Sequence, residues 1–591
     1  MTAAVVPALR GDVTAAAAQP SEPVRVSWRL SPSGSVAACT MVGAGGVPVL
    51  EIRHRAGSST QRRVVALPGL SVHSQLLPDD GGSVLVCHHR RGAHVVESVT
   101  VTGETTRIAT FVCQSVQLVR AGDAVLVLEG DGIRTHVHRL VADRLEPLVT
   151  VDGRALGAVA LDAAGERLAL NVMHDANPSQ AVEVEIATGE ATPLFSVRPT
   201  SEDQVVDHVA GANLIVVSTT AWGTPRVGFG RPGQEPVRFP DGLPAGAVTY
   251  LGASRDGTRI AVSVEQGAVS SIRIVSTVSG EASRPDLPPL VVLGRGHLGD
   301  AELVVPVATP DHTGTLLRVD LVDGSWELDD ETVAASVPVR VTTLPGADGP
   351  IECVVVGDPE TARTVAVALH GGPLDAWRAH HEPLLAGLAR AGIAVVAPNV
   401  RGSTGYGTDH ALAIRDQWGG PDLADVLAVS GALRTLRGPD LPRPVVLGHS
   451  YGAWLAVLAA AAEPAAWSGC VSVSPFVSGR RVVDGGGPVA ELVRRLGGTS
   501  GPDLTTVAHR ITAPVLVLHG DLDTVVPVAE AEHLAEALDP DRSCLLRLGG
   551  CGHDVFTSPR RQDAIESIAA FCHHSSRRPQ AVRPTTTPER R

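Results

Sequence analysis

A repeated unit of turn and strand constrains the fold more than any other feature of this 591-residue sequence. A glycine in a turn, followed by an apolar, strand-like run, recurs seven times at intervals of 41 to 47 residues. The seven glycines are Gly34, Gly81, Gly122, Gly165, Gly211, Gly257 and Gly299. A period of this length with several short strands is typical of one propeller blade. The repeat therefore predicts a seven-bladed β-propeller over residues 24–335, in preference to a β-sandwich with irregular strands.

A second turn, near the end of a repeat, supports the same interpretation. It appears as VTGET (101–105), ATGEA (187–191), VSGEA (278–282) and VDGSW (322–326). Glycine at the centre of each turn is suited to a tight hairpin between two strands.

The pattern changes after about residue 335. The segment 336–350 has the composition of a linker, and apolar strand-like runs then alternate with helix-length stretches. This alternation predicts an α/β domain with a mostly parallel, doubly wound sheet over residues 336–574. Residues 1–23 are predicted to be an N-terminal extension, and the polar, arginine-rich residues 575–591 a disordered tail.

Composition excludes several classes of protein. A net charge of -14 argues against a nucleic-acid partner, because such proteins carry a basic surface. No run reaches the roughly 18 apolar residues of a membrane helix, and the first twenty residues lack the apolar core of a signal peptide. The eight cysteines form no CxxC pair, which favours buried free thiols over disulfides. We therefore expect a cytoplasmic protein with no membrane partner, whose oligomeric state, including a homo-oligomer, stays open.

The segment 445–456, VVLGHSYGAWLA, contains the motif G-x-S-x-G from Gly448 to Gly452. An apolar strand-like run precedes Ser450 and an alanine-rich, helix-like run follows it. A nucleophile on such a strand-to-helix turn needs glycines on both sides, because a side chain there would crowd neighbouring backbone. Ser450 is therefore the candidate nucleophile.

A serine hydroxyl needs a base, and the base needs an orienting carboxylate. Asp521 and Asp523 follow the strand-like run PVLVLHG, and His553 follows the next one. The order Ser, Asp, His, with each residue after a strand, is that of the α/β-hydrolase fold. Acyl transfer also needs donors for the oxyanion, and we expect the backbone N–H groups of Tyr451 and of Gly372, in VALHGGP (367–373), to supply them.

Five motifs together resemble the prolyl oligopeptidase family of serine peptidases, in particular its acylaminoacyl-peptidase-like branch. They are HGGP (370–373), NVRGSTGYG (399–407), GHSYGA (448–453), HGDLDTVVP (519–527) and GCGH (550–553). The resemblance implies that Ser450 is the nucleophile, Asp523 rather than Asp521 the triad acid, and His553 the base. It also implies that the propeller covers the active site and excludes large folded proteins.

One position departs from the family pattern. Relatives that bind peptides often carry arginine two residues after the triad aspartate, and this chain has Val525 there. A charged side chain that binds the substrate backbone is therefore missing or is supplied by another part of the chain. The other candidates for substrate binding are Trp377, Arg401, Phe476 and Val477. The alternative for Arg401 is an ion pair that holds its loop, and for the other three it is a position in the hydrolase core. The segment 477–504 is expected to pack over the site.

These observations predict a hydrolase that cleaves amide bonds of short peptides or small aminoacylated amides through an acyl-enzyme, as an exopeptidase or an acylaminoacyl peptidase. No cofactor or metal is expected, because the histidines and cysteines lack zinc-site spacing. The same triad could serve an acyltransferase, a cyclase, an esterase or a self-resistance amidase. An alternative of another class is a propeller binding protein whose hydrolase domain is catalytically silent.

Overall fold

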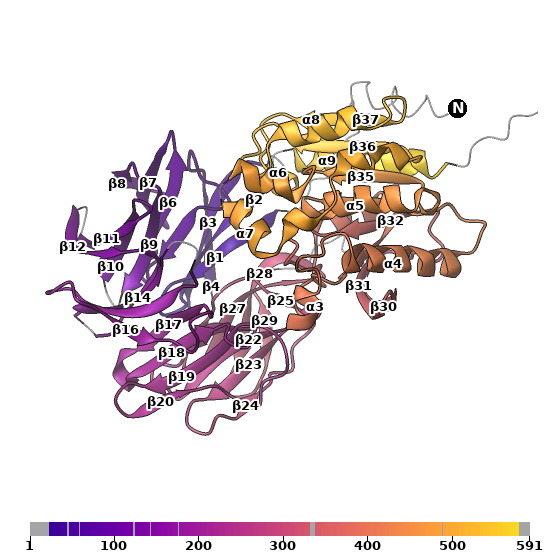
Figure 1. Ribbon diagram of the computed structural model, residues 1–591. Coiled ribbons are helices and arrows are strands. Elements are labelled where there is room, and N and C mark those ends of the chain that lie inside the picture. The colour runs from indigo at the N-terminus through magenta and orange to yellow at the C-terminus, as the bar shows by residue number, and fades with distance from the viewer. Residues whose placement is uncertain are drawn as a thin grey trace, which may run out of the picture.

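The computed structural model describes residues 23–43, 46–57, 59–121, 124–141, 144–162, 164–174, 177–330, 337–486, 488–558 and 560–577. A ring of seven β-sheets is followed along the chain by an eight-stranded sheet flanked by helices (Figure 1). This is the predicted combination of a seven-bladed propeller and an α/β hydrolase. Most of the predicted extension 1–23 and tail 575–591 lies outside the described residues, and the predicted domain limits remain a proposal.

Each blade is an antiparallel sheet made from one continuous segment. The strands of blades one to four are β1 (Val24–Leu30), β2 (Val36–Val42), β3 (Pro48–Ala56), β4 (Ser59–Val65); β5 (Gln75–Pro78), β6 (Ser83–Arg90), β7 (Ala93–Thr100), β8 (Thr105–Phe111); β9 (Ser115–Ala121), β10 (Ala124–Gly130), β11 (Arg134–Val141), β12 (Arg144–Asp152); β13 (Arg154–Ala160), β14 (Arg167–Met173), β15 (Gln180–Glu185), β16 (Ala191–Phe195). Those of blades five to seven are β17 (Asp203–Val209), β18 (Leu214–Thr219), β19 (Arg226–Arg231), β20 (Glu235–Arg238); β21 (Val248–Ala253), β22 (Arg259–Gln266), β23 (Val269–Ser276), β24 (Ala282–Ser283); β25 (Val291–Val292), β26 (His297–Leu298), β27 (Glu302–Thr309), β28 (His312–Asp320), β29 (Trp326–Leu328).

Both sequence repeats correspond to fixed places in a blade. The apolar run after each repeated glycine is the second strand of blades one to six, and β27 in blade seven. The glycine of the third run, Gly122, lies outside the described residues. The second turn lies between the third and fourth strands of a four-stranded blade, or between β28 and β29. Its glycines have φ values from +72° to +91°, the left-handed region that favours glycine. They are Gly103, Gly189, Gly280 and Gly324.

Side chains, and no shared strand, join the first blade to the last. Within the described residues, no sheet contains strands from both blades. Instead, the Thr313 hydroxyl of β28 donates to the carbonyl of Pro23 at 2.5 Å. Arg53 pairs with Glu51 at 2.6 Å and with Asp330 at 2.8 Å, and Arg25 pairs with Glu51 at 3.0 Å. A buried group of charges therefore lies at the closure of the ring.

The second part is a sheet in the order β30-β31-β33-β32-β34-β35-β36-β37. Its strands are β30 (Val339–Gly346), β31 (Gly349–Val356), β32 (Thr364–Leu369), β33 (Ile393–Pro398), β34 (Val445–His449), β35 (Gly469–Val473), β36 (Val515–Gly520) and β37 (Ser543–Leu548). The strands from β33 to β37 in this order run parallel, and most are buried, nearly continuous apolar runs. The seven strands β31 to β37 correspond to apolar strand-like runs of the sequence, as predicted.

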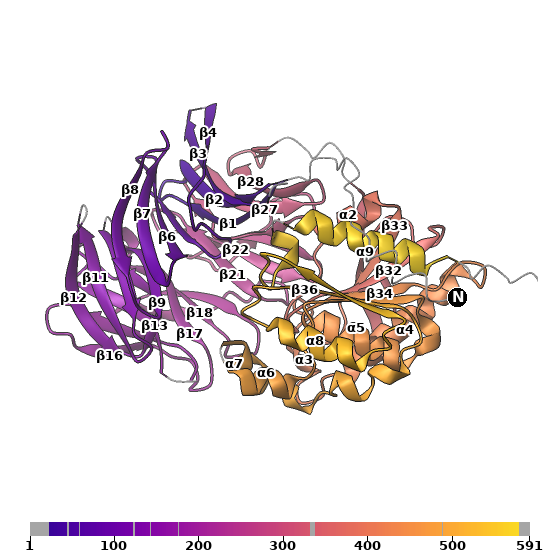
Figure 2. The same ribbon diagram turned by 90° about the horizontal axis from the view of Figure 1, so that it is seen from above.

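Helices cover both faces of this sheet (Figure 2). They are α2 (Pro383–Arg390), α3 (Thr408–Leu412), α4 (Pro421–Arg437), α5 (Tyr451–Ala462), α6 (Gly479–Gly485), α7 (Pro488–Arg495), α8 (Val528–Ala537) and α9 (Arg561–Ser575). One apolar core joins the sheet to α4, α5 and α8, and the other joins it to α2 and α9. Among the described residues, no helix has the length and apolar character needed to cross a bilayer.

The interpretation of 336–350 as a linker is wrong for its described part. Residues 339–346 form β30, which pairs antiparallel with β31 at the edge of the sheet. The strand was missed because most of its side chains are exposed, so it has no apolar run. The glycine and proline residues that suggested a linker belong to the hairpin, whose tip pairs Gly346 with Gly349.

The propeller contacts loops at one edge of the sheet. The N–H of His381, after β32, donates to the carbonyl of Thr309 at 2.9 Å, and Gly267 donates to Gly405, after β33, at 2.9 Å. Loops after the carboxyl ends of parallel strands meet at the same edge, where α/β proteins place their sites. The ring therefore covers the edge at which the predicted active-site residues lie.

Candidate active site

Ser450 lies at the junction between β34 and α5. Its backbone has φ +54° and ψ -116°, a conformation that residues other than glycine rarely adopt. A Cβ atom at Gly448 would lie 2.0 Å from the carbonyl oxygen of Gly452, and one at Gly452 would lie 2.3 Å from that of Leu369. The tight turn therefore excludes any side chain at both glycines.

His553 contacts both Ser450 and Asp523, although the three residues follow three different strands. Its Nε2 lies 3.0 Å from Ser450 Oγ, and its Nδ1 lies 2.7 Å from Asp523 Oδ2. Both distances are those of hydrogen bonds. Asp521, the other aspartate of that loop, instead accepts the N–H of Gly550 at 2.7 Å. The structure thus brings together the three residues predicted to form the triad.

The Asp523 side chain is fully buried. Its Oδ1 accepts the N–H groups of Val525 and Val526 at 2.9 and 2.8 Å, and its Oδ2 lies 3.1 Å from Nε2 of His519. Burial by itself raises the pKa of Asp523, but hydrogen bonds from His519 and His553, together with that from Val526, hold it well below its usual range. Asp523 is therefore a carboxylate at neutral pH.

Two residues that the sequence analysis missed hold the main chain of His553. The carbonyl of His553 lies 3.0 Å from His449 Nε2 and accepts the Ser474 hydroxyl at 3.2 Å. A carbonyl only accepts, so His449 Nε2 carries a proton. Burial, with a smaller effect of His553, lowers the pKa of His449 and keeps the ring neutral. The only signal for both was their position at the ends of β34 and β35.

The loop of the predicted oxyanion donor Gly372 lies beside Ser450. A Cβ atom at Gly371 would lie 3.6 Å from Cβ of Ser450, and Gly372 has φ +114°. Within the part of the chain that the structure describes, the N–H groups of Gly372 and Tyr451 donate no hydrogen bond to the protein. Both donors are therefore free to receive an oxyanion, and this role stays a prediction.

Three of the residues predicted to bind substrate have partners in the hydrolase core. The indole N–H of Trp377 donates to Ala368 O at 2.8 Å. Phe476 is stacked on Trp454 with ring centroids 6.0 Å apart. Val477 is 1% exposed. Apolar residues near strand ends serve the core as readily as a pocket, so their contact with substrate remains a prediction.

Arg401 forms an ion pair that holds its own loop. Its Nε and Nη2 each lie 2.9 Å from an oxygen of Asp425, and its N–H donates to the same carboxylate at 3.0 Å. The Asp425 side chain is fully buried. The structure therefore gives Arg401 the loop-holding role that the sequence offered as the alternative to substrate binding.

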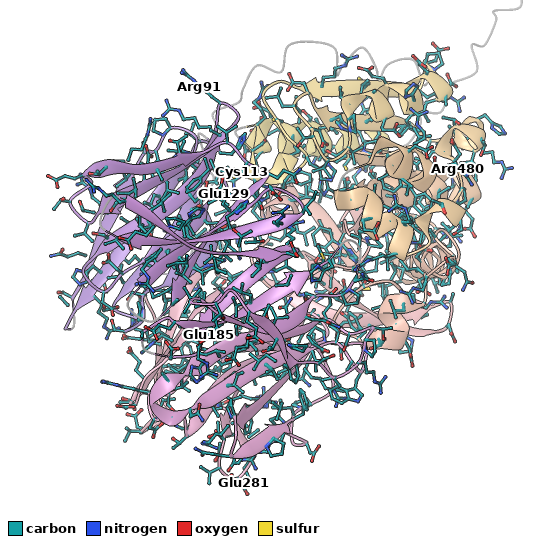
Figure 3. All side chains as sticks on the ribbon, turned by 60° about the vertical axis from the view of Figure 1, so that its left-hand side comes forward. Arg91, Cys113, Glu129, Glu185, Glu281 and Arg480 are labelled. Atoms are coloured by element: carbon teal, nitrogen blue, oxygen red, sulfur yellow. The ribbon has the colours of Figure 1, made fainter. Side chains whose placement is uncertain are left out.

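Val525, two residues after the triad acid, is 40% exposed, and Leu522, directly before that acid, is 63% exposed. This surface is apolar at the position where the family resemblance leads us to expect an arginine. Helices α6 and α7, within the segment 477–504, lie at the boundary between the two parts of the molecule (Figures 1 and 2). Arg480 of α6 lies on the outer surface of the hydrolase part (Figure 3), so it does not replace the missing arginine.

All eight cysteines are free, and six of them are buried. The prediction of free thiols is therefore confirmed. Among the described residues, no three histidine, cysteine, aspartate or glutamate side chains form a group that could hold a metal ion.

A seven-bladed propeller on an α/β-hydrolase domain, with serine, histidine and aspartate in hydrogen-bond contact, defines a class of propeller-capped hydrolases. Residues 380–577 match the model of the prolyl oligopeptidase family. This part of the chain is therefore similar to that family.

One curated relative matches a little less than half of the chain. An uncharacterized peptidase of Bacillus subtilis is 31% identical over 293 residues, which cover 46% of this chain and 44% of that protein. The chain is thus matched to less than half of that relative's length.

Solved structures share the architecture over nearly the whole chain. A puromycin-hydrolyzing peptidase of Mycobacterium tuberculosis has a TM-score of 0.77 at 18% identity, and covers 93% of this chain and 94% of its own. An acylaminoacyl peptidase of Pyrococcus horikoshii has a TM-score of 0.74 at 14% identity, covering 94% and 96%. At these identities the likeness establishes the fold.

Proposed function

We propose that the protein is a serine peptidase that cleaves amide bonds of short peptides or small aminoacylated amides. The observation that carries the proposal is the position of His553, 3.0 Å from the Ser450 hydroxyl and 2.7 Å from the Asp523 carboxylate. A serine hydroxyl is unreactive unless a base within hydrogen-bond reach removes its proton. This arrangement supplies that base together with a carboxylate that orients it.

In the proposed reaction, Ser450 Oγ attacks the amide carbonyl carbon while His553 Nε2 takes the hydroxyl proton. Asp523 fixes the ring orientation and stabilises the imidazolium. The N–H groups of Tyr451 and Gly372 bind the oxyanion. His553 then protonates the leaving amine as the C–N bond breaks, which leaves an acyl-enzyme. The same histidine then takes a proton from water, whose oxygen attacks the acyl carbon. The ester bond to Ser450 Oγ breaks, His553 returns the proton to that oxygen, and the acid is released.

Three features support small substrates. The propeller covers the edge of the sheet at which Ser450 lies, which limits access for folded proteins. The exposed Val525 and Leu522 offer apolar contacts beside the triad. Two structural relatives bear the names puromycin-hydrolyzing peptidase and acylaminoacyl peptidase. We therefore propose an aminopeptidase or acylaminoacyl-peptidase specificity.

The experiment is labelling of the purified protein by a fluorophosphonate probe, with Ser450→Ala as the control. We expect the wild type to be labelled and the variant not. An unlabelled wild type would reject the proposal in favour of a silent binding protein. A screen of aminoacyl and acyl-aminoacyl chromogenic amides then separates the two specificities, because an aminopeptidase responds only to substrates with a free amine.

We also propose a cytoplasmic location. The eight free thiols support it, since disulfides form and persist in oxidising compartments. Cell fractionation with an antibody to the protein tests it, and recovery from the secreted fraction would contradict it.

A further inference from the structure

The hairpin between β22 and β23 of blade six reaches into the hydrolase part. Its turn residues make three main-chain contacts there. The N–H of Gly267 donates to Gly405 O at 2.9 Å, and the carbonyl of Ala268 accepts the N–H of Ala379 at 2.8 Å. The N–H of Ala268 donates to Glu352 Oε1 at 2.7 Å. The turn of one propeller blade is thus hydrogen-bonded to three separate segments of the hydrolase.

Arg378 strengthens this contact from the hydrolase side. Its guanidinium donates to Gly267 O at 3.1 Å, to Glu265 Oε2 at 3.0 Å and to Thr404 Oγ1 at 3.2 Å. The Arg378 side chain is 13% exposed. A largely buried guanidinium with three hydrogen-bond acceptors stabilises the contact between two parts of a protein more than an exposed ion pair does.

Tyr406 forms a second bridge. Its hydroxyl donates to Glu352 Oε1, the oxygen that also accepts Ala268, at 2.7 Å, and it accepts from the Asn399 side-chain amide at 2.7 Å. Burial and the Glu352 carboxylate raise the pKa of Tyr406, so the hydroxyl keeps its proton and remains a donor.

The segment 399–407 contains Thr404, Gly405 and Tyr406, and it also contacts the loop of the predicted oxyanion donor. Ser403 Oγ lies 2.7 Å from Nε2 of His370, whose Nδ1 lies 2.7 Å from the carbonyl of Gly371. The N–H of Thr404 donates to Asp375 O at 2.8 Å. Segment 399–407 is therefore bonded to the blade-six hairpin and to the loop 370–375.

We propose that the blade-six hairpin is a positioning element for this oxyanion loop. The inference rests on the proposed function, because it assigns the hairpin an effect on that reaction. Loop 370–375 is neither helix nor strand, so its geometry depends on external partners. Oxyanion donors act only when held at hydrogen-bond distance from the developing charge. Gly267, Arg378 and Tyr406 are thus assigned as positioning residues, which act through loop 370–375.

The decisive variant is Gly267→Ala, with Gly280→Ala as its matched control. Both glycines are turn residues of blade six with positive φ, +61° and +80°. A Cβ atom at Gly267 would lie 2.4 Å from Glu352 Oε1, whereas nothing lies within 4 Å of one at Gly280. Both substitutions therefore place a side chain at a positive φ, and only the first disturbs the contact with the hydrolase.

We expect Gly267→Ala to lower kcat and the rate of fluorophosphonate labelling together by about 10- to 100-fold, with KM within about twofold. Gly280→Ala should keep both rates within about twofold of the wild type. Tyr406→Phe removes one hydroxyl and adds no bulk, and it should lower the same two rates. It serves as the test if Gly267→Ala does not fold.

The outcomes separate the two proposals. Suppose that the wild type is labelled, and that Gly267→Ala and Tyr406→Phe both fold and react at the wild-type rate. The hairpin then has no positioning role, and this inference alone is overturned. Equal losses in Gly267→Ala and Gly280→Ala would overturn it as well, because strain would then explain both. If the wild type is not labelled, the proposed function fails and the inference fails with it.

Discussion

At the scale of single residues, the site depends on positions where a side chain cannot fit. Ser450 is held in a strained conformation by close packing of Gly448 and Gly452 against neighbouring backbone. Backbone atoms cannot rotate away as a side chain does, so a methyl group at either glycine must displace a strand or helix α5.

We predict that Gly452→Ala destabilises the protein by at least about 3 kcal/mol, because its Cβ would lie 2.3 Å from Leu369 O. Gly431→Ala, in helix α4 with nothing within 4 Å of the added atom, should instead stabilise it by about 0.5–1 kcal/mol. Thermal unfolding of both variants measures the difference. Equal changes in stability from the two substitutions would show that the contact at Gly452 is unimportant.

A second residue-scale prediction concerns Asp523→Asn. The amide can still accept the N–H groups of Val525 and Val526, so the loop should keep its shape. It can no longer stabilise a charged imidazole, and we expect kcat to fall about 10⁴-fold. Steady-state kinetics on a chromogenic amide and the melting temperature are measured together. A fall in kcat of less than tenfold would contradict the role of Asp523.

At the scale of elements, the strands of the hydrolase sheet could be predicted because buried parallel strands are continuous apolar runs. Strand β30 could not, because an exposed edge strand carries no such run. The triad could be predicted because strand ends of a parallel sheet converge at one edge. The contacts of His449 and Ser474 with His553, and of Tyr406 with Glu352, could not, since they depend on distances between residues far apart in sequence.

A titratable group caps the amino-terminal end of α2. The Glu382 side chain accepts the N–H of Leu385 at the start of this helix. Burial raises the pKa of Glu382 to about 7, and the nearby Asp554 adds to the effect. The folded chain therefore holds this proton to a higher pH than the unfolded chain. Unfolding releases it, so the free energy of unfolding falls as pH rises from about 4.5 to about 7, and this contribution is lost once pH exceeds the folded-state pKa.

We predict that Glu382→Gln removes this contribution, because glutamine keeps an acceptor for Leu385 and carries no charge. The melting temperature of the variant relative to the wild type should rise between pH 5 and pH 8. Glu536→Gln, an exposed glutamate of α8, should show no such trend. A difference that is the same at both pH values would contradict the burial of a charged Glu382.

At the scale of the whole molecule, the closure of the propeller depends on buried charges. Glu51 accepts hydrogen bonds from Arg25, Arg53 and Arg62, and its side chain is fully buried. Burial by itself raises the pKa of Glu51, but the arginines outweigh it and lower that pKa. Removal of the carboxylate would leave the buried Arg25 without its ion-pair partner and Arg53 with Asp330 alone.

Glu51→Gln should therefore destabilise the protein by about 3–5 kcal/mol. The matched control is Glu183→Gln, whose partner Arg167 is 53% exposed and whose loss should cost less than about 1 kcal/mol. Calorimetry of the two variants tests the comparison. Similar small losses would show that packing alone closes the ring.

Every blade is formed by one continuous segment of the chain, so the architecture does not fix the number of blades. Duplication of one such stretch of the gene would add a whole sheet, and deletion would remove one, without breaking a ladder that two sheets share. The side chains that meet where the first and last blades adjoin would need to be refitted, as would the contacts of the ring with the hydrolase part. Rings of this kind can therefore change circumference over evolution while the sheet carrying the chemistry stays as it is.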